Sequence, residues 1–241
     1  MTNTFIEQMS RELGALGISL TQRQMEQFFA YYNLLAEKNK VMNLTAITEE
    51  AQVVTKHFVD SLSLVKALHP SEFSTVIDVG TGAGFPGIPI KILYPDIHLT
   101  LLDSLNKRIR FLEEVCQTLQ LSDVCCIHGR AEDAARDSSH RESYDLCVSR
   151  AVAGLASLAE YCIPFVKEGG YFVAYKSAEI KEELALGGKA VSVLGGRVEL
   201  VIDFCLPDSD YSRSPVKIKK IKPSPKKYPR KAGLPAKDPI L

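Results

Sequence analysis

The sequence predicts an α/β protein built on a parallel sheet, and three observations support this fold class. Short apolar runs rich in β-branched residues alternate with helical stretches from residue 74 onward. The runs are apolar throughout, as strands covered by helices on both faces of a sheet are. The first run, residues 75–79, stops at a glycine-rich turn, which is typical of α/β sheets that bind a ligand at this edge.

Residues 1–70 are predicted to form an N-terminal helical cap or subdomain, because they show no strand pattern. Apolar residues at helical spacing indicate a first helix from residue 5 to 16. Thr21 is a suitable N-cap for a second helix that runs to about Lys40. Its expected apolar face consists of Met25, Phe28, Phe29, Tyr32 and Leu35. A third helical segment, near residues 53–68, ends before Pro70.

Residues 71–222 are predicted to form the Rossmann-like domain. Its expected parallel strands are residues 75–79, 99–103, 124–127, 145–148 and 171–175, and its expected helices are residues 88–93, 105–119 and 155–166. Residues 199–206 and 216–221 follow as two further strands, interpreted as a closing hairpin. Residues 223–241 are rich in proline and lysine and are expected to be a basic, extended tail.

Composition excludes several classes of protein. The 241 residues are 46% hydrophobic and 24% charged, a globular balance, and no apolar run is long enough to span a bilayer. The six cysteines are scattered without a Cys-x-x-Cys pair, and the five histidines do not cluster, so we expect neither disulfides nor a metal site. No signal-peptide pattern opens the sequence, which favours the cytoplasm. We expect a monomer with no membrane partner.

The glycine-rich turn has the sequence Asp-Val-Gly-Thr-Gly-Ala-Gly at residues 78–84. The glycines Gly80, Gly82 and Gly84 allow a sharp turn and the close approach of a ligand to the backbone. A pyrophosphate-binding loop has no use for a carboxylate at Asp78, whereas a ligand with an ammonium group does. The methionine end of S-adenosylmethionine carries such a group.

Asp103 ends the next predicted strand, where a carboxylate can accept hydrogen bonds from both ribose hydroxyls. NAD and S-adenosylmethionine both need this contact. Residues 129–133 follow the third strand, at the place expected for adenine contacts. Asp103 alone could instead cap the following helix, but three features at the ends of three consecutive strands favour a nucleoside cofactor.

These residues and several others resemble the RsmG family, also called glucose-inhibited division protein B. The resemblance covers nearly the whole chain and rests on residues 43–45, 78–87, 102–104, 130–132, 149–151 and 226–233, and on His57 with Asp60 and Ser61. It implies a class I methyltransferase fold and transfer of a methyl group from S-adenosylmethionine to N7 of one guanine in small-subunit (16S) ribosomal RNA. The cofactor contacts that it implies are Gly80, Phe85, Ala131, Glu132 and Arg150. Ser104, next to Asp103, is a further expected cofactor contact.

Guanine N7 chemistry agrees with the residues that follow the fourth strand. Ser149-Arg150-Ala151 contains neither the proline nor the aromatic residue of enzymes that methylate exocyclic amines. N7 carries a free lone pair, so its methylation needs no general base. We expect Arg150 to contact the cofactor or to hold the guanine, with Arg130 as a weaker candidate. A structural salt bridge is the alternative for Arg150.

The charge distribution suggests an RNA partner, either ribosomal RNA or the ribosomal subunit. Residues 213–241 hold ten basic residues and one acid, whereas residues 1–212 hold 19 basic and 28 acidic residues. The predicted phosphate contacts are Lys217, Lys219, Lys220, Lys226, Lys227, Arg230 and Lys231. A tail that only improves solubility is the alternative. His57 and Asp60, one helical turn apart, are expected to form a polar pair or to line the site.

Three other functions remain open at this point. The first is a methyltransferase that acts on another RNA or on a small molecule, which would share the cofactor residues. The second is an NAD-dependent reductase, which Asp78 and the lack of a Tyr-x-x-x-Lys pair disfavour. The third is a non-enzymatic RNA-binding module, which leaves the glycine-rich turn and Asp103 unexplained.

Overall fold

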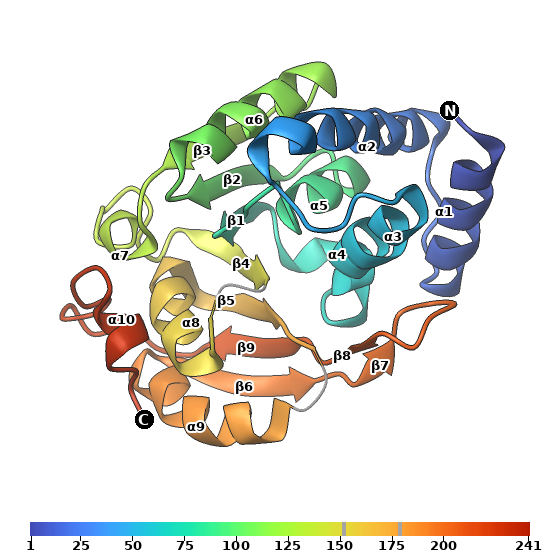
Figure 1. Ribbon diagram of the computed structural model, residues 1–241. Helices are drawn as coiled ribbons and strands as arrows, with labels where there is room; N and C mark the ends of the chain where they lie inside the picture. The colour runs from blue at the N-terminus through green and yellow to red at the C-terminus, as the bar shows by residue number, and fades with distance from the viewer. Residues whose placement is uncertain (151–152, 178–179) are drawn as a thin grey trace.

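The computed structural model describes residues 1–150, 153–177 and 180–241. A seven-stranded sheet with helices on both faces forms the centre of the molecule (Figure 1). The strand order is β3-β2-β1-β4-β5-β9-β6. The strands are β1 (Thr75–Val79), β2 (His98–Asp103), β3 (Val124–His128), β4 (Tyr144–Arg150), β5 (Val166–Tyr175), β6 (Gly196–Val201) and β9 (Val216–Lys220). The Rossmann-like fold predicted from the sequence is confirmed.

The first five strands are parallel, and β9 pairs antiparallel with both β5 and β6. The two last predicted strands are therefore direct partners, as a closing hairpin requires. The short pair β7 (Phe204–Cys205) and β8 (Ser212–Arg213) lies in the connection between β6 and β9. All five parallel strands direct their carboxyl ends to one edge, where ligands bind in folds of this kind.

Alternate residues of each strand face two separate apolar layers. Val76 of β1 packs with α5 (Gly87–Leu93), α6 (Asn106–Thr118) and the N-terminal helices. Ile77, one residue later, packs with α8 (Leu155–Cys162) and α9 (Ile180–Val193) on the opposite face. This period of two follows from strand geometry, and it explains why the strands are apolar throughout.

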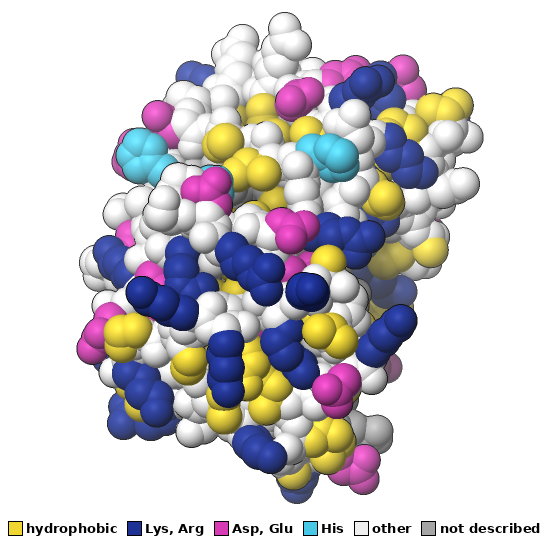
Figure 2. Space-filling model, turned by 90° about the vertical axis from the view of Figure 1, so that its left-hand side faces the viewer, with side chains coloured by type: hydrophobic (Ala, Val, Ile, Leu, Met, Phe, Trp, Pro, Cys, Tyr) yellow, Lys and Arg dark blue, Asp and Glu magenta, His cyan; other side chains and the backbone are white. Residues whose placement is uncertain are grey.

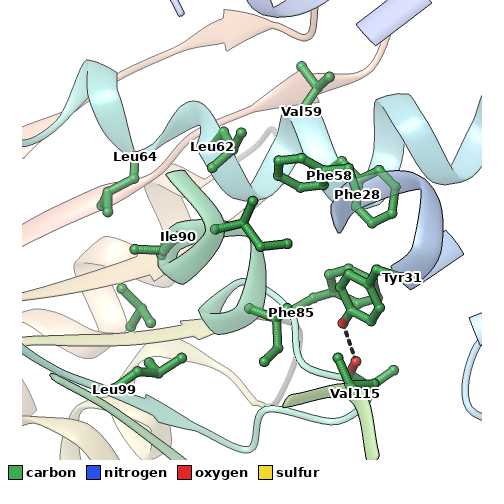
Figure 3. Close-up of a cluster of buried hydrophobic side chains, with 14 of the residues drawn as sticks. Phe28, Tyr31, Phe58, Val59, Leu62, Leu64, Phe85, Ile90, Leu99 and Val115 are labelled. Carbon is green, nitrogen blue, oxygen red and sulfur yellow. Dashed lines mark hydrogen bonds between the residues drawn. The ribbon is translucent and has the colours of Figure 1, made fainter. Parts of the chain in front are cut away.

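The N-terminal region is helical, as predicted, and belongs to the same apolar core as one face of the sheet. Its helices are α1 (Asn3–Ala15), α2 (Gln22–Met42), α3 (Glu50–Val53), the π-helix η1 (Val54–Val59), α4 (Asp60–Leu62) and the 3₁₀ turns η2 (Ser63–Lys66) and η3 (Pro70–Glu72). A capping box between Thr21 and Gln24 starts α2, which confirms the predicted N-cap. Phe28 and Phe58 pack beside Phe85 of the glycine-rich turn (Figure 3).

The predicted apolar face of α2 is partly wrong. Tyr31 is completely buried, whereas Phe29 and Tyr32 are only half-buried. The buried residues follow the spacing 25, 28, 31 and 35, which is one of two helical stripes that the sequence allows.

The C-terminal segment, residues 223–241, is not the extended tail that the sequence predicts. It folds back on the body and contains the short helix α10 (Leu234–Lys237), which packs against α8. Arg230 is paired with Glu160 of α8, a fully buried carboxylate, at 2.8 Å. A buried carboxylate needs a partner of opposite charge, and this requirement anchors the segment. Within the described residues, no helix combines the length and apolarity needed to cross a membrane.

Candidate active site

The glycine-rich turn connects β1 to α5 at the carboxyl edge of the sheet. Gly80, Gly82 and Gly84 have φ angles of 71°, 63° and 100°, a region that residues with a side chain avoid. A Cβ atom on Gly84 would lie 2.6 Å from the hydroxyl oxygen of Tyr31. Tyr31 in turn donates a hydrogen bond to the carbonyl of Ala83 (dashed line, Figure 3). Helix α2 therefore fixes the turn from behind, and the turn requires glycine.

The Asp78 carboxylate stabilises the glycine-rich turn through hydrogen bonds. Its Oδ2 accepts hydrogen bonds from the Thr81 hydroxyl at 2.7 Å and from the Gly87 N–H at 2.8 Å. Its Oδ1 is buried and has no hydrogen-bond partner among the described residues. Burial raises the pKa of Asp78 to about 6. The side chain of Asp78 is completely buried. Its direct contact with a ligand's ammonium group stays a prediction.

Asp103, at the end of β2, connects the turn to helix α6. Its Oδ2 accepts from the Gly82 N–H at 3.0 Å and from Arg108 at 3.2 Å, and its Oδ1 accepts from the Leu105 N–H at 2.9 Å. The helix-capping role considered from the sequence is wrong, because the N-cap of α6 is Leu105 and no side chain caps the helix. A carboxylate has about four lone-pair positions, so Asp103 keeps capacity for a further donor.

Two cavities open at this edge of the sheet, with volumes of about 800 and 310 Å³. Both are lined by Gly80, Asp103 and Ser104, so they meet at the end of β2. The predicted residues Gly82, Phe85 and Arg150 also line the first cavity. The second also contains Arg130, Ala131 and Glu132. Asp78 and Gly84 line neither cavity. The structure therefore brings most of the predicted cofactor residues to one continuous edge.

Arg150 lies at the centre of a polar cluster that borders the first cavity. Its guanidinium donates to Asp60 Oδ2 at 2.9 Å and to the Lys56 carbonyl at 3.2 Å. Asp60 is buried, and its Oδ1 accepts from Arg213 Nε at 2.8 Å. Arg150 thus forms the structural ion pair considered as the alternative, and it also lines the first cavity. Its contact with the cofactor or the guanine stays a prediction.

His57 and Phe85 lie beside Arg150 and also line the first cavity. The His57 ring stacks on Phe85 with centroids 4.4 Å apart, and Tyr31 stacks on the same ring at 5.2 Å. The Arg150 guanidinium carbon lies 5.2 Å from the Phe85 centroid. Both His57 and Asp60 line the first cavity, as one of the two sequence-based alternatives expected.

His57 is electrically neutral at physiological pH. Burial, and then the positive charge of Arg150, lower the pKa of His57 to about 3. Its Nε2 is 2.9 Å from the Thr45 hydroxyl, and its Nδ1 is 3.3 Å from an Arg150 nitrogen. A histidine with so low a pKa is a weak base. It belongs to the π-helix η1, a form that often occurs at functional sites.

The basic residues predicted to bind RNA fall into two groups. Lys217 and Lys220 are buried, which contradicts a role in phosphate contact. Lys217 pairs with Glu72 and Glu199, and Lys220 pairs with Glu142 at 3.0 Å. Lys219 is half-buried over Tyr171. These strand positions compensate acidic neighbours, which a count of charges does not reveal.

The C-terminal basic residues differ from those of β9. Lys226, Lys227 and Lys231 are exposed. Arg230 is partly buried and is held by Glu160 and by Asp238, so it acts first as an anchor.

Sequence reasoning missed two site residues. Arg213 was counted only as one more basic residue near the C-terminus, yet it lines the first cavity and binds Asp60. Tyr31 supports the turn, and only the helical spacing of α2 could have pointed to it. No local signal marks Arg213, because its partner lies 153 residues away in the sequence.

Comparison with known proteins gives consistent matches. The rRNA small subunit methyltransferase G family matches residues 24–209. Ribosomal RNA small subunit methyltransferase G of Lachnoclostridium phytofermentans is 52% identical over 239 residues, which cover 99% of this chain and 97% of that protein. The protein of the same description from Alkaliphilus metalliredigens is 53% identical over 225 residues, covering 93% and 94%. The structure of a Methanococcus jannaschii fibrillarin pre-rRNA processing protein shares the fold, with a TM-score of 0.51 and 18% identity over 64% of this chain and 70% of that one.

Proposed function

Because the chain belongs to the rRNA small subunit methyltransferase G family, we propose that it transfers the methyl group of S-adenosylmethionine to N7 of one guanine in small-subunit ribosomal RNA. The observation that carries this proposal is the pair of cavities that meet at Asp103, beside a polar cluster that contains no strong free base. We also propose a cytoplasmic location, because ribosomal subunits are the proposed substrate.

The residues present fit S-adenosylmethionine. A carboxylate at the junction of the two cavities suits a ribose diol. The smaller cavity combines apolar Val79 and Leu102 with the backbone of residues 129–132, which suits a planar base. The larger one contains the charged side chains Arg108 and Arg150, which suit an amino-acid end. An added Cβ on Gly82 would have one neighbour within 4 Å, the Gly80 carbonyl oxygen at 4.0 Å, so the backbone there is accessible to a ligand.

When bound, S-adenosylmethionine supplies a methyl group on a sulfonium centre. Guanine N7 would take the methyl group with its own lone pair and lose no proton, while the methyl–sulfur bond would break and S-adenosylhomocysteine would leave as a neutral thioether. The polar cluster agrees with this chemistry: His57 is a weak base, and both carboxylate oxygens of Asp60 are engaged by arginines. The contribution of the protein is then positioning of the two reactants.

In this proposal Arg150 orients the target. One guanidinium nitrogen is held by Asp60 and the Lys56 carbonyl, the other lies 3.3 Å from His57 Nδ1, and Phe85 packs against the group. Arg150 also lines the cavity. The O6 atom of guanine or a neighbouring phosphate suits a guanidinium donor. Arg130 is exposed at the rim of the second cavity and is the weaker candidate.

RNA binding is proposed for the face that carries α7 (Ala131–Ala134) and α10. Figure 2 shows Lys and Arg side chains gathered over the lower part of this face. Exposed Lys226, Lys227 and Lys231 belong to the C-terminal segment that reaches it. Replacing all three by glutamine should reduce the slope of log K against log salt by about 2, from about 0.7 per phosphate contact. Arg23→Gln on α2 is the control and should leave the slope unchanged.

The direct test uses methyl-tritiated S-adenosylmethionine with naked small-subunit rRNA and, in parallel, with intact subunits that lack the modification. Mass spectrometry of nuclease digests locates the label. Label as 7-methylguanine at one site supports the proposal, and the better substrate shows when the reaction occurs in assembly. Label in another base, or cofactor binding without any label in RNA, would show that guanine N7 is not the acceptor. Absence of cofactor binding would overturn the function altogether.

A further inference from the structure

The C-terminal segment, residues 223–241, lies along the smaller cavity. Gly233 and Ala236 line that cavity together with residues 129–132 after β3 and Tyr161 of α8. Figure 1 shows α10 beside α8 and close to α7. One wall of a cavity at the sheet edge is therefore supplied by residues that follow the last strand of the sheet.

A buried carboxylate ties this wall to the loop after β3. Glu132 is 5% exposed, and its Oε1 accepts a hydrogen bond from the Gly233 N–H at 2.9 Å. Ala131 and Glu132 themselves line the cavity. The position of the C-terminal segment and the shape of this loop are thus linked through one side chain.

Further contacts hold the segment on either side of Gly233. The Arg230 backbone N–H and guanidinium both bind Glu160, which is completely buried. The Ser157 hydroxyl donates to the Pro235 carbonyl at 2.7 Å. Arg136 donates two hydrogen bonds to the Pro229 carbonyl. Hydrogen bonds of this number, several of them buried or charge-assisted, fix a segment in one place.

The two wall residues are small. Gly233 has a φ angle of 83° and no side chain, and Ala236 presents only a methyl group. Small residues at these two positions keep about 310 Å³ open beside apolar Val79 and Leu102. Ala236 is exposed as well as lining the cavity, and we expect a larger side chain at this position to reduce the open space.

We propose that the C-terminal segment forms a wall of the nucleoside part of the cofactor site, with Ala236 setting the room for the base and Glu132 holding the wall in place. This inference rests on the proposed function, because it takes the smaller cavity as the site of the adenosine end. The segment then serves cofactor affinity as well as RNA contact.

Calorimetry on the full chain tests the wall directly. The ligands are S-adenosylhomocysteine and methylthioadenosine, which has the nucleoside end without the amino-acid end. Ala236→Phe should weaken the binding of both by tenfold or more and by a similar factor. Ala232→Phe is the matched control, since Ala232 is exposed in the same segment and does not line the cavity; its Kd should stay within twofold of the unsubstituted protein. Thermal unfolding checks that both variants fold.

A second measurement needs no cavity-filling substitution. Saturating S-adenosylhomocysteine should slow tryptic cleavage after Lys231 by fivefold or more, as read by intact mass. Arg230→Ala, which removes the anchor on Glu160, should speed this cleavage in the absence of ligand.

The outcomes separate the two proposals. Equal Kd values for Ala236→Phe and Ala232→Phe, or cleavage after Lys231 that ligand does not slow, would show that the segment is not part of the site while the methyltransferase assignment stands. Failure of the unsubstituted protein to bind either ligand would overturn the cofactor assignment and the wall together.

Discussion

Removal of the Asp60 carboxylate should destabilise the protein strongly. Asp60 is 4% exposed at its side chain, and the two arginines that it binds, Arg150 and Arg213, are 13% and 20% exposed. The nitrogen–oxygen distances are 2.9 and 2.8 Å. Asp60→Ala leaves two largely buried cations without a carboxylate. Loss of one partner of a buried ion pair costs about 3–5 kcal/mol.

Urea unfolding and thermal unfolding measure this loss. A destabilisation of this size should lower Tm by roughly 6 to 20 °C, from about 2–4 °C per kcal/mol for a chain of this length. Asp208→Asn is the control, because its ion pair with Arg11 lies on the surface, where both side chains are more than half exposed. Asparagine also tolerates the left-handed backbone at this position, where φ is 53°. The control should leave Tm unchanged within error.

A double-mutant cycle shows whether the loss comes from the ion pair. Arg213→Ala combined with Asp60→Ala should cost less than the two single changes together, with a coupling of about 0.5–3 kcal/mol. The reasoning would be refuted if Asp60→Ala left Tm unchanged, as Asp208→Asn should. Strict additivity of Asp60→Ala and Arg213→Ala would likewise show that the carboxylate does not compensate Arg213.

Four other substitutions test the site and the packing around it. Arg150→Ala should lower incorporation of tritiated methyl groups into RNA about 100-fold or more; full activity with unchanged S-adenosylhomocysteine affinity would contradict its role. Gly84→Ala should cost about 2 kcal/mol or more in urea unfolding, because its φ is 100° and the new Cβ would lie 2.6 Å from the Tyr31 hydroxyl. Gly188→Ala, inside α9 with open space around it, should instead gain roughly 0.5–1 kcal/mol. The pKa of His57 in the folded protein is about 3, below its ordinary 6.5, so the unfolded chain binds a proton first as pH falls. The free energy of unfolding should therefore decrease as pH drops from 6.5 toward 3, by up to about 1.4 kcal/mol per pH unit. His57→Gln should flatten this part of the profile, and equal slopes would refute the assignment.

The sequence was sufficient for the features that depend on neighbouring residues. Strand patterns, the glycine-rich turn and Asp103 at the end of β2 all follow from local periodicity, and the parallel sheet then brings their ends together. Helix α9 was not assigned from the sequence. It contains Gly187 and Gly188, which weaken a helical pattern, and a Cβ on Gly187 would lie 2.9 Å from Leu155. Close packing of α8 on α9 therefore overrides helix propensity.

Features that depend on distant partners could not be predicted in this way. Lys217, Lys220 and Arg230 all counted as free positive charges, although each has an acidic partner in the folded chain. The acidic partners, such as Glu160, occur in apolar helices, and nothing in the neighbouring sequence indicates which basic residue will pair with them. Charge counts thus overestimated the surface available to RNA and concealed the anchored C-terminal segment.

The position of β9 inside the sheet has a consequence for how the chain folds as it is synthesised. The ribosome makes β6 before β9, yet β6 joins the sheet only through β9. Until residues 216–220 emerge, β5 presents an open edge and β6 has no hydrogen-bonding neighbour in the sheet. An unpaired edge invites pairing with other chains. A released chain truncated between residues 201 and 216 should therefore depend on chaperones more than the full chain.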